Sequence, residues 1–174
     1  MKELVLAIDA GTTHSGVVLT LLEDGNPPEV LEMFQDMKNE DLRYYSIKVH
    51  HIYGTRADRI FIEDIVSYGM EIGQTTMDTI KWNGRFAERL LIHEREVEWV
   101  SRKEVKIYLC GDSRAKTPNI TQSIRDIYTR AGLATGGGKD PVKGIKSNPG
   151  PLFGIAAHAW SALALIMAWQ LKDT

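Results

Sequence analysis

An apolar run that ends in a single carboxylate opens the chain and is followed at once by a short turn and a second apolar run. The first run covers residues 3–9 and ends at Asp9, the turn is "GTTHSG", and the second run is "VVLTLLE". Two β-rich runs joined by a short turn predict a β-hairpin. The hairpin places Asp9 at the carboxyl end of a strand, where it belongs either to a phosphate-binding turn or to a metal site.

The remaining elements predict an α/β fold, a central mixed five-stranded sheet with helices on both faces. A third strand, "EVLEMF", is expected to pair with the second strand, and "DRIFIEDI" and "VEWV" are the other two strands. Helices are expected over residues 40–53 with Asn39 as the cap, 75–94, 101–110 with Ser101 as the cap, 118–132 and 152–171. Three antiparallel strands followed by alternating helices and strands form a single domain over residues 1–174.

A segment rich in glycine, proline and lysine, residues 133–151, interrupts this order. Its sequence "LATGGGKDPVKGIKSNPGP" fits no packed element, so we expect a mobile loop that a phosphate backbone orders. The last helix is the most apolar segment of the chain. It contains His158 and Ser161 and has no basic anchors before its end, so we expect a buried helix and no membrane contact.

The cysteine count and the distribution of charge indicate where the protein works and what kind of partner it binds. The only cysteine, Cys110, allows no internal disulfide, and the apolar start is interrupted too soon by Asp9 for a signal peptide, so we expect a cytoplasmic protein. Between Ser101 and Asn148, ten basic residues stand against four acidic ones, which gives a net charge of +6 there and −8 elsewhere. Clustered cations favour contact with a polyanion, although a solvated helical surface has the same composition.

Asp9 and Glu63 both end predicted strands, Glu63 within "FIED". If these strands are neighbours, the carboxylates meet at one edge of the sheet, and their repulsion calls for a divalent metal ion. Each acid alone would equally well cap a helix or face solvent. On the last helix, His158 and Ser161 are three residues apart and share a face. His158 is either a core histidine or the third member of a metal site.

Four segments together resemble the RuvC-like Holliday junction resolvases, particularly phage-encoded members. These segments are "AIDAGTTHSG", "IFIEDI", the turn "IGQTT" and the terminal "HAWSALAL". The resemblance spans nearly the whole chain in element order. It implies an RNase H-like fold, a homodimer, and endonuclease activity on branched DNA in the cytoplasm of a bacterial host. It also implies two Mg²⁺ ions per active site, for which Mn²⁺ can substitute.

The resemblance also implies roles for single residues. Asp9 matches the first-strand aspartate, Glu63 the fourth-strand glutamate, and His158 the first ligand position of the terminal helix. We expect Asp9 to bridge two ions, Glu63 to bind one, and His158 to bind or orient at the other. A metal-activated water would then hydrolyse a phosphodiester.

Ser161 departs from this pattern, because the family normally has an aspartate at its position. A hydroxyl cannot replace the charge of a carboxylate, so one ion would be held less tightly or another acid would substitute. Asp64 is the nearest spare carboxylate, although alternation along a strand points it to the opposite face from Glu63. Asp140, in the expected mobile loop, is the weaker candidate.

Contacts with DNA are expected outside the acidic site. Tyr68 follows the strand of Glu63, and its ring would stack on an unpaired base at a branch point or pack on its own loop. The candidates for phosphate contacts are the basic residues Lys103, Lys106, Arg114, Lys116, Lys139, Lys143 and Lys146.

Two other functions compete with the nuclease. The turn "DAGTT" also resembles the first phosphate loop of sugar kinases and actin-like ATPases. Those phosphotransferases need a second lobe and a second phosphate loop, and "TGGGKD" lacks the preceding strand and the following hydroxyl of a P-loop. The other alternative is a non-catalytic branched-DNA-binding protein, in which Ser161 marks a lost metal ligand. Such a protein would bind branched DNA without magnesium and release no product.

Overall fold

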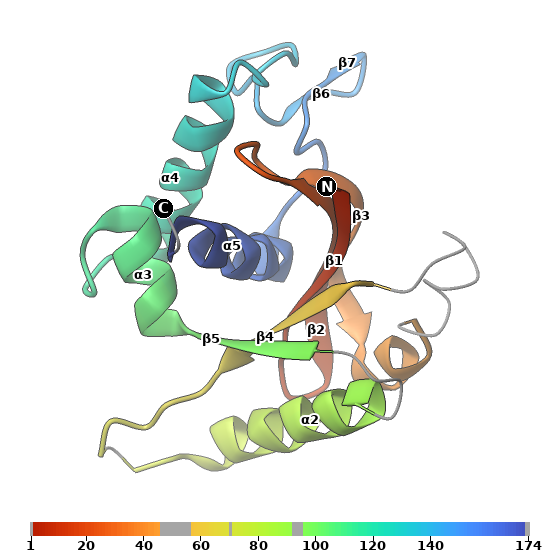
Figure 1. Cartoon of the computed structure of the whole chain (residues 1–174), viewed down its shortest axis with the longest axis vertical. Coiled ribbons are helices and arrows are strands. Elements are labelled where there is room, and N and C mark those ends of the chain that lie inside the picture. Colours follow the sequence, from red (N-terminus) through yellow and green to blue (C-terminus); the bar gives the residue numbers. More distant parts are fainter. Residues whose placement is uncertain (1, 46–56, 70, 92–95, 173–174) are drawn as a thin grey trace.

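A five-stranded mixed sheet forms the centre of the computed structural model, which describes residues 2–45, 57–69, 71–91 and 96–172 (Figure 1). Its strands are β1 (Lys2–Asp9), β2 (His14–Glu23), β3 (Glu29–Lys38), β4 (Arg59–Asp64) and β5 (Glu96–Ser101). The strand order is β3-β2-β1-β4-β5. The first three strands are antiparallel, and β4 and β5 run parallel to β1. The predicted sheet is confirmed.

Helices cover both faces of this sheet, as predicted. They are α2 (Gln74–Leu91), α3 (Arg102–Cys110), α4 (Thr117–Arg130) and α5 (Ala157–Lys172). Figure 1 shows α5, with α3 and α4 beside it, on one face of the sheet and α2 on the other. A further helix begins at Asn39 and continues through residue 45, and the rest of the helix predicted over residues 40–53 lies outside the described residues.

Two hydrophobic cores follow from the alternation of side chains along the strands. On β1, Val5 and Ala7 belong to the core under α5, whereas Leu6 and Ile8 belong to the core under α2. Because both faces are covered, β1 is apolar on both sides. α5 is apolar around most of its circumference because it lies inside the first core. No helix within the described residues is long and apolar enough to span a membrane.

The start of α3 is fixed by the cap that the sequence predicts. The hydroxyl of Ser101 accepts a hydrogen bond from the backbone N–H of Glu104, and the carboxylate of Glu104 accepts one from the backbone N–H of Ser101. Gly111 ends the helix in a left-handed conformation, with φ of 68°. The capping box therefore places Arg102, the first residue of α3, directly at the carboxyl end of β5.

The segment 133–151 differs from the sequence expectation, because it does contain a packed element. A small antiparallel hairpin pairs β6 (Gly144–Ile145) with β7 (Asn148–Pro149), and Val142 beside it is buried in the core under α5. A Cβ atom at Gly144 would overlap the backbone of the facing strand, so the glycine is needed here for close backbone packing and for its left-handed φ of 71°. Turns follow, and α5 begins at Ala157 rather than at residue 152.

Candidate active site

Two carboxylates lie next to each other at the carboxyl edge of two neighbouring parallel strands. Asp9 ends β1, Glu63 lies one residue before the end of β4, and the register of the strands puts the two residues at the same level. Both side chains point to the α5 face, since Ala7 and Phe61, two residues earlier in their strands, belong to the core on that face. The two strands are neighbours in the sheet, which is the condition under which the sequence predicts that the carboxylates meet.

Burial and mutual repulsion make it unfavourable for both carboxylates to be ionised at once. Asp9 is only 6% exposed and Glu63 is partly buried. Burial first, and the negative charge of Asp9 second, raise the pKa of Glu63 from 4.5 to about 7. The positive charge of Arg102 acts in the opposite direction, as does the charge of a His158 ring when it is protonated, and a hydrogen bond to Asp9 favours protonated Glu63. Near neutral pH, therefore, a proton partly takes the place that a metal cation would fill.

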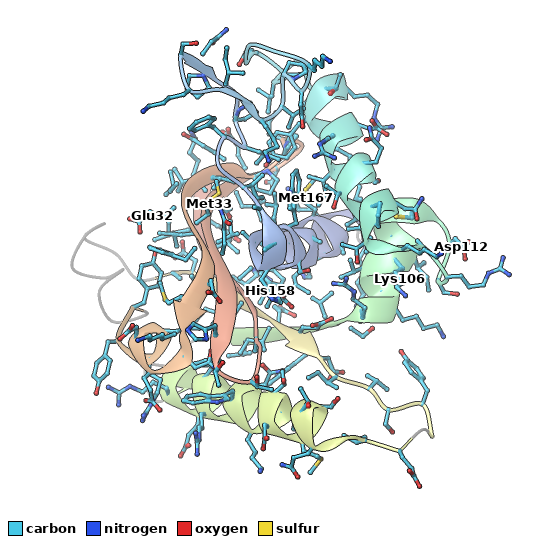
Figure 2. All side chains as sticks on the ribbon, turned by 180° about the vertical axis from the view of Figure 1, so that it is seen from behind. Glu32, Met33, Lys106, Asp112, His158 and Met167 are labelled. Carbon is cyan, nitrogen blue, oxygen red and sulfur yellow. The ribbon has the colours of Figure 1, made fainter. Side chains whose placement is uncertain are left out.

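His158 joins the carboxylates from the first turn of α5 (Figure 2). Its Nδ1 lies 2.8 Å from Oδ2 of Asp9. A carboxylate only accepts hydrogen bonds, so Nδ1 donates, and the lone pair of a neutral ring is on Nε2. Gly16, the partner of Asp9 on β2, makes room for this arrangement, because a Cβ atom there would overlap the backbone and the Cβ of His158.

A buried asparagine holds the turn that follows Asp9. Asn39 was predicted to cap a helix, but it is the first helical residue, and its side chain serves the turn instead. Its Nδ2 donates to the carbonyl of Gly11 over 3.0 Å, and its Oδ1 accepts from the hydroxyl of Ser15 over 2.6 Å. Its backbone N–H donates to the carbonyl of Thr13. The end of β3 therefore positions the turn next to the carboxylates.

Ser161 lies one turn after His158 on α5, and its partner is an arginine that the sequence analysis did not single out. Nη1 of Arg102 donates to Oγ of Ser161 over 3.3 Å. The two residues are 59 positions apart, so no local pattern in the sequence indicates the contact. The charge of Arg102 also acts on the carboxylate of Glu63, as its effect on that pKa shows. Arg102 therefore belongs to the surroundings of the site.

Asp9 and Glu63 have the chemistry of ligands for a divalent cation. Two partly buried carboxylates that repel each other provide the hard oxygen ligands that Mg²⁺ prefers. Neither substitute acid joins them: Asp64 still lies within β4 and so points to the opposite face from Glu63, and Asp140 forms an ion pair with Arg125 at 2.9 Å. Across the described residues, no three acidic, histidine or cysteine side chains gather into a group that could hold a metal ion.

Tyr68 and Lys103, two of the predicted DNA contacts, lie together. Tyr68 is 60% exposed, and its φ of 44° is a left-handed conformation that is unusual for an aromatic residue. Nζ of Lys103 lies 5.5 Å from the centroid of its ring, within the range of a cation–π contact. An exposed aromatic ring and a cation therefore stand next to Arg102 at the start of α3.

The other predicted phosphate contacts are spread over three regions. Lys106 is half-buried on α3 (Figure 2), and the exposed Arg114 and Lys116 precede α4, with Arg114 in an ion pair with Asp112. The remaining three, Lys139, Lys143 and Lys146, belong to the segment of the β6–β7 hairpin, with Lys146 at its tip. The structure thus groups α3 with the carboxylates and keeps the hairpin lysines on a separate element.

No protein-family model and no curated protein matches the sequence. The fold is nevertheless similar to solved structures. Thermus thermophilus RuvC has a TM-score of 0.64 at 16% identity, covering 98% of this chain and 95% of that chain. T. thermophilus RuvC in complex with a Holliday junction substrate has a TM-score of 0.68 at 15% identity, covering 98% and 94%. The yeast mitochondrial Holliday junction resolvase Ydc2 has a TM-score of 0.55 at 10% identity, covering 97% and 80%. The chain therefore has a RuvC-like fold.

Proposed function

We propose that this protein is a metal-dependent endonuclease that cuts branched DNA, of the Holliday junction resolvase type. The observation that carries the proposal is the pair of carboxylates, Asp9 and Glu63, level with each other on parallel strands of a RuvC-like fold. The raised pKa of Glu63 supports it, because buried carboxylates that repel each other favour a cation between them. The T. thermophilus RuvC structure with a Holliday junction supports branched DNA as the substrate class.

Asp9 and Glu63 would hold the divalent ion, with Mg²⁺ expected and Mn²⁺ as its substitute. When bound, such an ion supplies a Lewis acid that polarises the phosphodiester and lowers the pKa of a water molecule. His158 keeps Nδ1–H on Asp9, so Nε2 of the neutral ring can accept a proton from the attacking water. The water oxygen bonds to phosphorus while the bond from phosphorus to the 3′ oxygen breaks.

The residues around Asp9, Glu63 and His158 would bind the substrate. Tyr68 would stack on an unpaired base at the branch point, and Lys103 beside it would contact a phosphate. Cleavage of a four-way junction into two duplexes requires one cut in each of two strands. We therefore propose a homodimer that presents two sites, which sedimentation of the protein alone and with a junction would measure.

The test is incubation of the protein with a labelled immobile four-way junction and with a matched linear duplex, in magnesium, in manganese and in EDTA. We expect paired symmetric nicks in the junction that disappear in EDTA and with Asp9→Asn. Asp64→Asn is the matched control, because it removes a neighbouring carboxylate on the other face of the sheet and should leave cleavage intact. Full metal-dependent cleavage by Asp9→Asn would make the assignment wrong.

A non-catalytic branched-DNA-binding protein is the second candidate. It is favoured by Ser161, which stands where the resembled family has an aspartate and which pairs with Arg102 instead. This candidate predicts equal junction binding in magnesium and in EDTA, with no nick in either metal. In that case Ser161→Asp is the first change to make, and nicking by that variant would identify a site that has lost one ligand.

A further inference from the structure

A guanidinium lies next to Ser161, the position at which the resembled family has a carboxylate. Arg102 reaches from the start of α3 to two other helices. Its Nη1 donates to Oγ of Ser161 on α5 over 3.3 Å, and its Nη2 donates to Oγ1 of Thr117 at the start of α4 over 3.2 Å. Two hydrogen bonds from separate elements therefore fix the orientation of the guanidinium.

The partners of Arg102 leave its charge in place. Within the described residues, both of its side-chain hydrogen bonds go to neutral hydroxyls, in contrast to Arg59 and Arg125, which form ion pairs with acids. The guanidinium also lies near the carboxylates, because Ser161 is one turn after His158 on α5 and Nδ1 of His158 lies 2.8 Å from Oδ2 of Asp9. A carboxylate at position 161 would instead form an ion pair with Arg102. The serine and the arginine are therefore matched: the hydroxyl orients the guanidinium without neutralising it.

We propose that Arg102 binds the phosphate that is cut, contacting its non-bridging oxygens and supplying the positive charge that a second metal ion would otherwise bring. The inference rests on the proposed nuclease function and specifies how its site works with one ion. Two observations agree with it: no metal-binding group of three donors is found among the described residues, and the guanidinium is hydrogen-bonded to Ser161, one turn after His158. Guanidinium is suited to this role, because its planar fork matches two phosphate oxygens.

The alternative role is purely structural, since Arg102 also ties α3 to α4 and α5. A structural tie predicts lower stability for any substitution and no dependence on the charge of the DNA. A phosphate contact predicts that the effect of removing Arg102 depends on one particular phosphate. The two roles are therefore separated by a double-mutant cycle. The arginine and the charge of one phosphate are removed singly and together, and the losses of binding are compared.

The experiment measures junction binding in EDTA by fluorescence anisotropy for the wild type, Arg102→Met and Arg102→Lys. Each protein is tested with an ordinary junction and with junctions in which one phosphate near the branch point is a neutral methylphosphonate, moved one position at a time. Arg85→Met is the control, because it removes the same charge from an exposed arginine on α2, across the sheet from α3. Thermal unfolding identifies any variant that does not fold. If Arg102→Met does not fold, the same comparison is made with Arg102→Lys.

We expect Arg102→Met to weaken binding of the ordinary junction roughly tenfold or more. The loss should vanish when the methylphosphonate replaces one phosphate, the one at which the wild type cuts in magnesium. Arg102→Lys should recover part of the binding, and Arg85→Met should show no coupling to that phosphate. A loss that persists with every methylphosphonate, or wild-type binding by Arg102→Met, would overturn the proposal for Arg102. Binding in EDTA is measured without cleavage, so the two proposals can fail separately. A wild type that binds the junction but does not cut it in magnesium would overturn the proposed nuclease function and leave the phosphate contact measurable. A wild type that does not bind branched DNA would overturn both proposals.

Discussion

Asp9 and Glu63 lie so close together that the ionised pair costs the folded protein free energy. Burial and the charge of Asp9 raise the pKa of Glu63 from 4.5 to about 7. Between these two pH values the folded protein holds a proton that the unfolded chain has lost. Stability therefore falls as the pH rises from 4.5 to about 7, and above that range the full cost remains unless a cation binds.

The variant Glu63→Gln should remove this cost. We expect it to be more stable than the wild type at pH 8 in EDTA by roughly 1 to 3 kcal/mol, and to differ little at a pH near the ordinary pKa of glutamate. Urea unfolding at the two pH values measures the difference, and Mg²⁺ at pH 8 should stabilise the wild type more than the variant. Glu88→Gln, on the exposed side of α2, is the control. An unchanged pH profile for Glu63→Gln would contradict the coupling.

Asn39 supports the site through the turn after Asp9 and is itself 1% exposed. We expect Asn39→Ala to cost roughly 1 to 3 kcal/mol, because it leaves the buried hydroxyl of Ser15 without its acceptor. Adding Ser15→Ala should recover part of that loss. Urea unfolding of the two single variants and the double variant measures the coupling, and strictly additive losses would show that the two side chains do not depend on each other.

The packing of α5 against β2 holds His158 beside Asp9, and Gly16 is the point of contact. We expect Gly16→Ala to cost about 1 to 3 kcal/mol, because the added methyl group meets backbone that cannot rotate away. Cleavage should fall further than stability explains, since the helix moves His158 away from Asp9. Thermal unfolding and junction cleavage measure the two effects.

Gly84→Ala is the matched control for this packing. Gly84 lies inside α2 with open space around its missing side chain, so alanine should stabilise the protein by up to about 1 kcal/mol and leave cleavage unchanged. If Gly16→Ala behaved like Gly84→Ala in both measurements, the close approach of α5 to β2 would not be what positions His158.

Much of the fold was predictable because its signals are local. The apolar runs that end at Asp9 and Glu63 predict the two strands, and Ser101 is predicted as the cap of α3, which the structure confirms. That these strands are neighbours was only a condition of the sequence argument, and the sheet meets it. The segment 133–151 was expected to hold no packed element, yet it holds the β6–β7 hairpin. In a sequence, a glycine that permits close backbone packing cannot be distinguished from one that permits motion.

The parts of the site that were not predictable depend on contacts between distant segments. Arg102 meets Ser161 across 59 positions, and Asn39 meets Ser15 across 24. Neither pair leaves a pattern along the chain, because each partner is an ordinary polar residue in its own element. Only the folded arrangement shows that the serine in the usual acidic position has a cation as its neighbour.

The distribution of charge over the whole protein predicts how it binds DNA. We expect Lys146→Met, at the tip of the β6–β7 hairpin, to weaken binding to junction and duplex alike, because a phosphate contact does not read structure or sequence. The slope of log affinity against log salt should fall by about 0.9 for each lost contact with a duplex phosphate. Binding titrations over a series of KCl concentrations measure both effects.

Lys81→Met is the control for this prediction. Lys81 lies on α2, across the sheet from α3, and pairs with Asp78 at 3.0 Å. Its loss should leave the salt slope unchanged. Equal slopes for the wild type and Lys146→Met would exclude the hairpin tip from the DNA contact.

The site is assembled from opposite ends of the chain, since Asp9 and His158 are 149 positions apart. A ribosome completes α5 after every other described element, and α5 also supplies a large part of the core on its face of the sheet. A nascent or truncated chain that lacks α5 therefore has both carboxylates but neither His158 nor a closed core. For a proposed nuclease this order means that the three side chains come together only after α5 has been synthesised and has packed on the sheet.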